Sequence, residues 1–292
     1  MSKTQAWLLA SRPKTLFAAA SPVILAAAAA YYDNKTLPAL IFFLTIICAV
    51  LLQIASNLIN DYYDGIRGLD DEDRLGPTRV TSSNLLSSNE VKKGCLFVMT
   101  LALLVGIYLM IQGGLPIVVI GLSSLFFAWA YTGGPFPLSY YGLGEVFAFL
   151  FFGPIALWGA GYLFGSTNHE LLLTLGLGPG FISATIMGIN NLRDLYSDKK
   201  KGKKTIATFL GEKKARLFTV GLAWVSSFVP FMVYARLQKN SVLIATLLFY
   251  AFILVWNHIL TKPIDKKLND CLANTGKYLF FFCLVLSAGL VF

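Results

Sequence analysis

The chain has 292 residues, of which 56% are hydrophobic and 13% are charged. A soluble domain carries about 25% charged residues, so this composition argues against a soluble fold. The net charge of +9 would suggest a nucleic-acid partner in a soluble protein. Here the basic residues border long apolar runs, which indicates that they set membrane orientation and face anionic lipids, and no nucleic acid is expected as a partner.

The apolar residues fall into runs of about 20, the length at which a helix crosses a bilayer core. Only helices or closed barrels satisfy the backbone in lipid, and these runs lack the two-residue alternation of barrel strands. The sequence therefore predicts an all-α polytopic membrane protein with about nine transmembrane helices in one domain, 1–292. The predicted spans cover about 15–31, 37–60, 94–111, 116–131, 146–164, 171–190, 217–234, 242–258 and a last segment from near Cys271 to Phe292.

Two polar islands follow the second and sixth spans, which places them on the same side of the membrane. The first island is residues 57–79 (NLINDYYDGIRGLDDEDRLGPTR) and the second is residues 190–205 (NNLRDLYSDKKKGKKT). Of the 24 Lys and Arg residues, all but Lys35, Arg236 and Lys239 fall on that side. The positive-inside rule then predicts an inner (plasma) membrane protein with its N-terminus and both islands in the cytoplasm and its C-terminus outside.

Both islands carry an Asn and an Asp four residues apart. These are Asn60 and Asp64 in the first island and Asn190 and Asp194 in the second, with Asp198 a further four residues on. A spacing of four places side chains on one face of a helix. We interpret the two islands as a weak internal repeat that brings two related acidic helix ends together.

The islands also mix further acids with basic residues. Clustered carboxylates repel one another unless a cation holds them, and Mg²⁺ binds one or two carboxylates together with substrate phosphate oxygens. The pattern predicts a site for a Mg²⁺-diphosphate above apolar spans that suit a hydrocarbon tail, as in a prenyl diphosphate. The metal and the basic side chains would stabilise the departing diphosphate. The remaining acids are Asp61, Asp70, Asp71, Glu72 and Asp73, and the bases are Arg67, Arg74, Arg79, Arg193, Lys199–Lys201, Lys203 and Lys204.

Not every charge in the islands is expected to bind a ligand. Asp71 and Glu72 are interpreted as solvated acids. Most of the lysine run at 199–204 is interpreted as topogenic charge, with Lys203 or Lys204 as candidates for phosphate contact.

The motifs and their order resemble the UbiA-type superfamily of intramembrane aromatic prenyltransferases, and more narrowly the 1,4-dihydroxy-2-naphthoate polyprenyltransferases of menaquinone biosynthesis. The segments that carry this resemblance cover nearly the whole chain. They are Arg12-Pro13-Lys14-Thr15, NDYYDGIRG with DRLGPTR, the connector YTGGPFPLSYYGLGE, NNLRDLYSD with GKKT, and Leu210-Gly211.

The resemblance implies nine helices around a central cavity that opens laterally, a polyprenyl diphosphate and an aromatic acid as substrates, and Mg²⁺ as cofactor. It implies attack of a ring carbon on the prenyl cation, with loss of CO₂ in the naphthoate branch. The implied metal ligands are Asp64, Asp70, Asp194 and Asp198, supported by Asn60, Asn190 or Asn191. Arg79, Arg193 and Lys203 would hold diphosphate, and Tyr131, Arg12 and Lys14 would line the cavity.

The first motif departs from the common superfamily pattern N-x-x-x-D-x-x-x-D, because Gly68 occupies the last Asp position. The next acids are Asp70 and Asp73, a longer spacing that the naphthoate branch shares. The second ligand of this motif therefore stays open, with Asp61 as the other candidate.

Two other functions are compatible with parts of the sequence. The same chemistry could act on 4-hydroxybenzoate, a homogentisate-like ring, or a chlorophyll or haem precursor. A secondary transporter would use the acids to bind ions, and it finds support in Gly176, Gly178, Pro179 and Gly180, which interrupt the sixth span. Transporter sites lie near the bilayer midplane, however, whereas these acids lie at the ends of spans. A structural or lipid-scaffold protein would not need paired acidic islands.

Overall fold

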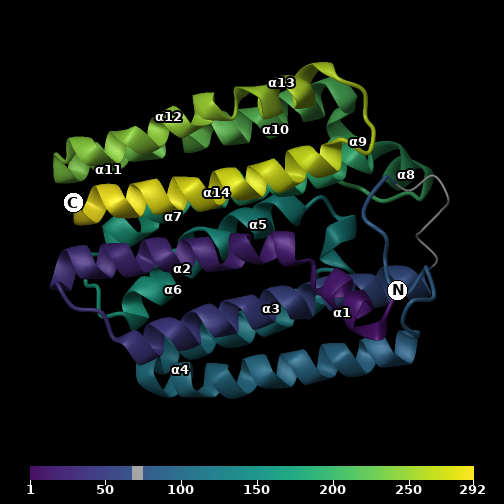
Figure 1. The fold of residues 1–292 in the computed structure, drawn as a ribbon, viewed down its shortest axis with the longest axis horizontal. Helices are drawn as coiled ribbons and strands as arrows, with labels where there is room; N and C mark the ends of the chain where they lie inside the picture. Colours follow the sequence, from purple (N-terminus) through teal and green to yellow (C-terminus); the bar gives the residue numbers. More distant parts are fainter. Residues whose placement is uncertain (68–74) are drawn as a thin grey trace.

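The computed structural model describes residues 1–67 and 75–292, and helices dominate this part of the chain (Figure 1). Within it, the only β-type pairing is an isolated parallel bridge between Tyr141 and Lys204. The helices are α1 (Lys3–Ser11), α2 (Pro13–Asn34), α3 (Ala39–Ile66), α4 (Ser88–Ala130), η1 (Leu138–Tyr140), α5 (Gly144–Phe152), α6 (Pro154–Leu163), α7 (His169–Arg193), α8 (Leu195–Lys200), α9 (Ile206–Leu210), α10 (Glu212–Ser226), α11 (Val229–Leu237), η2 (Asn240–Leu243), α12 (Ile244–Ala251), α13 (Ile253–Thr261) and α14 (Leu268–Val291).

Eight helical stretches of the described chain are long and apolar enough to cross a membrane. One of them, α4, has 43 residues and consists of two helices joined at Gly114, whose φ of 62° and ψ of −155° are not helical. Glycine adopts this backbone conformation without the steric penalty of a side chain. Counting the two halves of α4 separately gives nine spanning segments among the described residues, which confirms the predicted all-α membrane fold.

The most buried span is α7, which packs against α5, α6, α10 and α14. Its glycines permit very close packing with the break between α5 and α6. A Cβ atom on Gly153 would lie 2.5 Å from the Cα of Gly180, and one on Gly176 would lie 2.7 Å from the Cα of Pro154. These small residues therefore determine how closely α5 and α6 pack against α7.

The prediction that glycines and Pro179 interrupt the sixth span was wrong. In the structure α7 is one continuous helix with Pro179 inside it. Buried neighbours support the helix through this turn, since Leu175, Ile182 and Ile189 are completely enclosed. The feature that favoured a transporter is thus a packing surface.

One end of the bundle, here called the polar end, carries α1, α8, α9 and the N-terminus, whereas the C-terminus lies at the opposite end (Figure 1). The sequence analysis did not predict α1, although Ser2 and Gln5 form a capping box that marks its start. Helix α1 packs onto α3. Ala6 and Ala10 of α1 join Leu58, Val80 and Val91 in a small apolar cluster. This cluster anchors residue 80, and with it the chain around Arg79, against α3.

Candidate active site

Asp61 holds the segment that carries Arg79. Its side chain is 2% exposed, and its Oδ2 accepts the backbone N–H of Val80 at 3.1 Å while Oδ1 accepts that of Thr81 at 3.0 Å. The Thr81 hydroxyl also donates to Oδ1, at 2.5 Å. Both oxygens of Asp61 are thus engaged in positioning residues 79–81, which speaks against Asp61 as the second ligand of the first motif.

The nearest acid along α3 is Asp64, which pairs with the segment that Asp61 positions. Arg79 Nη2 lies 2.5 Å from Asp64 Oδ2, and both side chains keep a small exposed fraction. One turn earlier on α3, Asn60 Oδ1 accepts a hydrogen bond from the Thr132 hydroxyl in the 131–145 connector. The first motif therefore presents Asp64 beside a guanidinium, next to the connector.

The second motif is arranged around Arg193, the last residue of α7, which is 4% exposed. Its guanidinium donates to both carboxylate oxygens of Asp194, at 2.9 and 2.6 Å, and to Asn190 Oδ1 at 2.7 Å. It also donates to Asn269 Oδ1, and the Asn269 amide donates to the Leu75 carbonyl. This chain of contacts links the end of α7 to α14 and to the end of the first island.

The spacing of four suggested one unbroken helix through the second motif, but the structure has a break there. Helix α7 ends at Arg193, Asp194 joins the two helices, and α8 begins at Leu195. Backbone bonds from Asp194 N to Asn190 O and from Asp198 N to Asp194 O nevertheless continue the four-residue register. The acids therefore still follow one another along the same side.

Asp198 is the most deeply placed of these acids. Its Oδ2 is buried without a hydrogen-bond partner among the described residues, and Lys203 Nζ lies 3.6 Å from it. Burial raises the pKa of Asp198 to about 6, while the Lys203 ammonium opposes this shift and the Asp194 carboxylate adds to it. The carboxylate of Asp64 adds to it as well, so acids of both islands share one electrostatic field.

The connector of residues 131–145 joins the islands. Arg67, at the end of α3, donates to the carbonyls of Thr132 and Gly134 at 2.6 and 2.9 Å. The Arg67 guanidinium carbon and the Lys203 ammonium each lie within 6 Å of the Tyr140 ring centroid, at 5.8 and 5.9 Å. One tyrosine of the connector thus contacts a cation from each island, a relationship that sequence spacing did not reveal.

The two asparagines of the second motif have different partners. Asn190 binds Arg193, whereas Asn191 donates to Glu145 Oε1 at 2.9 Å. Nearby, the Tyr131 hydroxyl bonds Met187 Sδ at 3.3 Å. Burial raises the pKa of Tyr131, and the carboxylates of Glu145 and Asp64 raise it further. Tyr131 therefore lies near acids of the site, and Glu145 is a buried acid of this region that was not singled out from the sequence.

The predicted residues at the N-terminus lie where α1 meets α2. Arg12 adopts a left-handed conformation (φ 50°) that ends α1 and precedes α2, and Lys14 is exposed on the first turn of α2. Asn57, one turn before Asn60, donates to the Ser11 carbonyl and to the Thr15 hydroxyl at 3.0 and 3.1 Å. This junction is thereby held against the helix that bears the first motif.

Asp70, the predicted fourth metal ligand, lies outside the described residues, as does Asp73. Among residues 1–67 and 75–292 no group of three or more His, Cys, Asp or Glu side chains is arranged to hold a metal ion. The donor chemistry nevertheless fits Mg²⁺, because Asp198 offers a buried carboxylate oxygen without a hydrogen-bond partner. Asp64 and Asp194 add carboxylates that are now neutralised by arginines.

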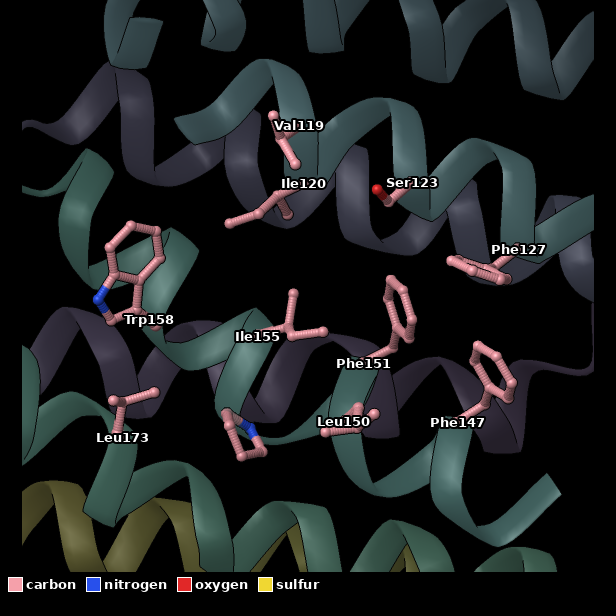
Figure 2. Close-up of a pocket in the computed structure, with 11 residues that line it drawn as sticks. Val119, Ile120, Ser123, Phe127, Phe147, Leu150, Phe151, Ile155, Trp158 and Leu173 are labelled. Carbon is pink, nitrogen blue, oxygen red and sulfur yellow. The ribbon is translucent and has the colours of Figure 1, made fainter. Parts of the chain in front are cut away.

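An apolar cavity of about 510 Å³ lies between the second half of α4, helices α5 and α6, and Leu173 of α7 (Figure 2). Phe127, Phe147 and Phe151 point into it from α4 and α5, and Trp158 bounds it on α6. A smaller cavity of about 230 Å³ shares Phe127 and reaches Gly133 and Gly134 of the connector. Two apolar cavities therefore follow one another along α4 from the connector, with Phe127 lining both; the larger one is called the groove below.

Comparison with known proteins agrees with this arrangement. The profile of the UbiA prenyltransferase family matches residues 19–285. The chain is 36% identical to the 1,4-dihydroxy-2-naphthoate octaprenyltransferase of Escherichia coli K12, over 75% of this chain and 72% of that protein. It is 34% identical to the enzyme of the same name from Mycobacterium tuberculosis H37Rv, over 80% of this chain and 79% of that protein.

Among solved structures, a UbiA homologue from Archaeoglobus fulgidus bound to GPP and Mg²⁺ has the same fold. The TM-score is 0.70 at 16% identity, with 98% of this chain and 99% of that chain covered. The fold and the site define a multi-pass helical membrane protein whose paired acids and bases gather at one end of the bundle. The chain belongs to the UbiA prenyltransferase family, which confirms the resemblance seen in its motifs.

Proposed function

We propose that this chain transfers a polyprenyl group from a polyprenyl diphosphate to 1,4-dihydroxy-2-naphthoate, releasing diphosphate and CO₂ and forming demethylmenaquinol, the reduced form of demethylmenaquinone. The observation that carries the proposal is that acids of both islands stand in ion pairs around one connector. These pairs are Asp64 with Arg79, Asp194 with Arg193, and Asp198 with Lys203. The names of the curated relatives support the choice of acceptor.

The ion pairs suit a ligand that brings both a metal and an anion. Asp64, Asp194 and Asp198, together with Asp70, would bind Mg²⁺, and Asn60 and Asn190 would support them. Arg79, Arg193 and Lys203 would then turn from the carboxylates to the diphosphate, so each charge exchanges one partner for another. Bound there, Mg²⁺ would neutralise charge on the leaving diphosphate.

The groove of Figure 2 is the proposed site of the prenyl tail. Its lining is apolar and aromatic, and it approaches the connector through Phe127. Because bilayer hydrocarbon is as apolar as this lining, the tail would be held by packing contacts and not by the hydrophobic effect. Aromatic faces also stabilise a neighbouring cation, which suits an allylic intermediate. Tyr131, Arg12 and Lys14 are proposed to face the acceptor on the polar side.

We place the polar end in the cytoplasm. Support comes from the basic residues that are exceptions to the cytoplasmic set. Lys35 and Lys239 lie between helices and Arg236 lies in the last turn of α11, all at the far end of the bundle. The N-terminus lies at the polar end and the C-terminus at the other (Figure 1).

The test is prenyl transfer in purified membranes with radiolabelled polyprenyl diphosphate, Mg²⁺, and either 1,4-dihydroxy-2-naphthoate or 4-hydroxybenzoate. We expect label in a naphthoquinone-type lipid, release of CO₂ from carboxyl-labelled naphthoate, and loss of both with EDTA or Asp194→Asn. The matched control is Asp270→Asn, which removes an exposed carboxylate from the first turn of α14. Label only in prenylated hydroxybenzoate would overturn the acceptor, and no transfer to either acceptor would overturn the proposal.

A further inference from the structure

Glu145, the last residue of the connector, is a buried acid with one carboxylate oxygen left over. It lies on the first turn of α5 and is 4% exposed. Its Oε1 accepts the Asn191 amide at 2.9 Å, whereas Oε2 is buried without a hydrogen-bond partner among the described residues. Leaving such an acceptor unsatisfied costs about 1–3 kcal/mol, more for a charged group, so its retention calls for an explanation.

Only two acids of the described chain, Asp198 and Glu145, have a buried carboxylate oxygen without a hydrogen-bond partner. Asp198 lies among the other acids of the motifs, where a bound metal ion would be the missing partner of its carboxylate oxygen. Glu145 has a different setting. Its neighbours are the Asn191 amide and the Tyr131 phenol, whose oxygen lies 2.8 Å from the place a Cβ would take on Gly144. The Lys203 ammonium already acts on Glu145 from a greater distance, so this neighbourhood suits a neutral hydrogen-bond donor rather than a further cation.

The position of Glu145 lies between the two halves of the proposed substrate site. Its partner Asn191 comes three residues before Asp194 on α7, at the diphosphate end. Two residues beyond Glu145 on α5, Phe147 lines the groove proposed for the tail (Figure 2). The carbon that joins diphosphate to tail must lie between these two regions, and the aromatic acceptor must reach that carbon.

We infer that Glu145 accepts the hydroxyl hydrogen of the aromatic acceptor through Oε2 and takes that proton as the new carbon–carbon bond forms. Asn191 holds the other oxygen and so orients the carboxylate. This role rests on the proposed function, and it makes Glu145 a catalytic residue and Asn191 a positioning residue.

The chemistry balances with the carboxylate as a shuttle. The bond from the first prenyl carbon to diphosphate breaks, and diphosphate leaves with the electron pair. The ring carbon that bears the carboxylate bonds to the prenyl carbon, while the adjacent hydroxyl gives its proton to Glu145 and becomes a ketone. CO₂ then leaves this β-keto acid, its electron pair restores the ring, and Glu145 returns the proton to oxygen. Glu145 ends unchanged.

The experiment compares wild type with Glu145→Gln, Glu145→Asp and the matched control Glu170→Gln. Gln keeps an oxygen for the Asn191 amide but cannot take a proton. Glu170 is an exposed acid paired with Arg236, on the first turn of α7 and thus at the opposite end of that helix from the second island. Each protein is assayed in membranes with polyprenyl diphosphate, Mg²⁺ and 1,4-dihydroxy-2-naphthoate from pH 6 to pH 9. A second acceptor, methylated on the 1-hydroxyl, carries no proton to transfer.

General bases contribute about 10²- to 10⁴-fold, so we expect kcat of Glu145→Gln to fall at least about 100-fold at pH 7. The KM for polyprenyl diphosphate should stay within about threefold of wild type, and activity should rise with pH as the free acceptor ionises. Glu145→Asp should retain part of the activity. At pH 6, where the free acceptor is un-ionised, the methylated acceptor should slow wild type to about the level of the Gln variant, and its rate should not rise with pH in either protein because it has no proton to lose. Lys203 is the titratable neighbour whose charge reaches Glu145, and Tyr131 is a neighbouring phenol that stays protonated; neither changes among the variants.

Two results would overturn the role of Glu145 while leaving the proposed function intact. One is an active wild-type protein together with a Glu145→Gln variant whose kcat lies within about threefold of the wild-type value and whose pH profile is the same. The other is a Gln variant that loses polyprenyl diphosphate binding as severely as turnover, because that would mark a structural role. A wild-type protein inactive on the naphthoate would instead overturn the proposed function, and the inference with it.

Discussion

Arg193 and Asp194, neighbours in the chain, form a two-point ion pair in which Nε and Nη2 each donate to a different carboxylate oxygen, at 2.9 and 2.6 Å. Such a fork is specific to arginine, because a lysine offers a single point charge. The pair sits where α7 ends, so its geometry sets the direction in which the second motif leaves the central helix.

The fork predicts that Arg193→Lys is not a conservative change. We expect kcat/KM for polyprenyl diphosphate to fall about 10- to 100-fold, because one ammonium cannot hold Asp194, Asn190 and the diphosphate in the same geometry. Arg236→Lys, at the exposed pair with Glu170, is the control and should stay near wild type. Equal activity of the two variants would contradict the role of Arg193.

The pKa of Asp198 predicts a trade between stability and activity. Burial raises this pKa to about 6, above the ordinary 3.8, so the folded protein binds the proton more tightly than the unfolded chain. In metal-free detergent, the contribution of Asp198 to stability should therefore be fully present below about pH 4 and be lost as pH rises through about 6, whereas acids with a lowered pKa such as Glu90 act in the opposite direction. The gap between the folded and unfolded pKa of Asp198 corresponds to a loss of roughly 3 kcal/mol in the free energy of unfolding.

Asp198→Asn should remove that decline and most of the activity together. In EDTA at pH 7.5 we expect its thermal unfolding temperature to equal or exceed that of wild type. Added Mg²⁺ should raise the unfolding temperature of wild type and leave that of the variant unchanged. A variant that is both less stable without metal and still stabilised by Mg²⁺ would refute this account.

The spans were predictable because membrane helices are specified locally. A run of about 20 apolar residues is sufficient information, and the reversal at Gly114 was visible as the gap between the third and fourth predicted spans. The spacing of four likewise marked Asn190, Asp194 and Asp198 as neighbours, and the backbone keeps that register. The short helix α1 was not predicted, because its nine residues are too few to be recognised as a membrane span, although its capping box marks a helix start.

The pairings within the site were not predictable from the chain. Asp61 looks like a ligand in sequence, yet it is committed to the backbone at Val80 and Thr81, which lie 19 and 20 residues away. The contact of Asn191 with Glu145 likewise spans 46 residues. Such contacts depend on how spans pack, and a single sequence carries no direct record of packing. The glycines of α7 illustrate the same limit, because a stretch rich in Gly and Pro can either break a helix or form a closely packed helix surface, and the sequence does not distinguish the two.

That packing surface gives a prediction for stability. A methyl group on Gly153 would meet the Phe149 carbonyl and the Gly180 Cα at 2.5 Å, so Gly153→Ala should force α5 and α6 away from α7. Overpacking of this kind costs about 1–3 kcal/mol. The matched control is Gly221→Ala in α10, where nothing lies within 4 Å and the helix should gain about 0.5–1 kcal/mol. Thermal unfolding in detergent measures both, and equal unfolding temperatures would contradict the packing role.

The groove predicts a change in preferred tail length. Ser123 points into the cavity among Ile120, Phe127 and Phe151, so Ser123→Phe should fill space that a long tail would occupy (Figure 2). Crowding of the bound tail by the added ring should cost about 1–3 kcal/mol, which lowers kcat/KM for a long polyprenyl diphosphate about tenfold. A short donor such as geranyl diphosphate should be unaffected, because its tail would end before Ser123. Leu122→Phe adds an aromatic ring at a side chain that is 52% exposed and does not line the cavity, so it should leave both donors unchanged. The ratio of rates with long and short donors is the measurement, and an unchanged ratio in Ser123→Phe would place the tail elsewhere in the bundle.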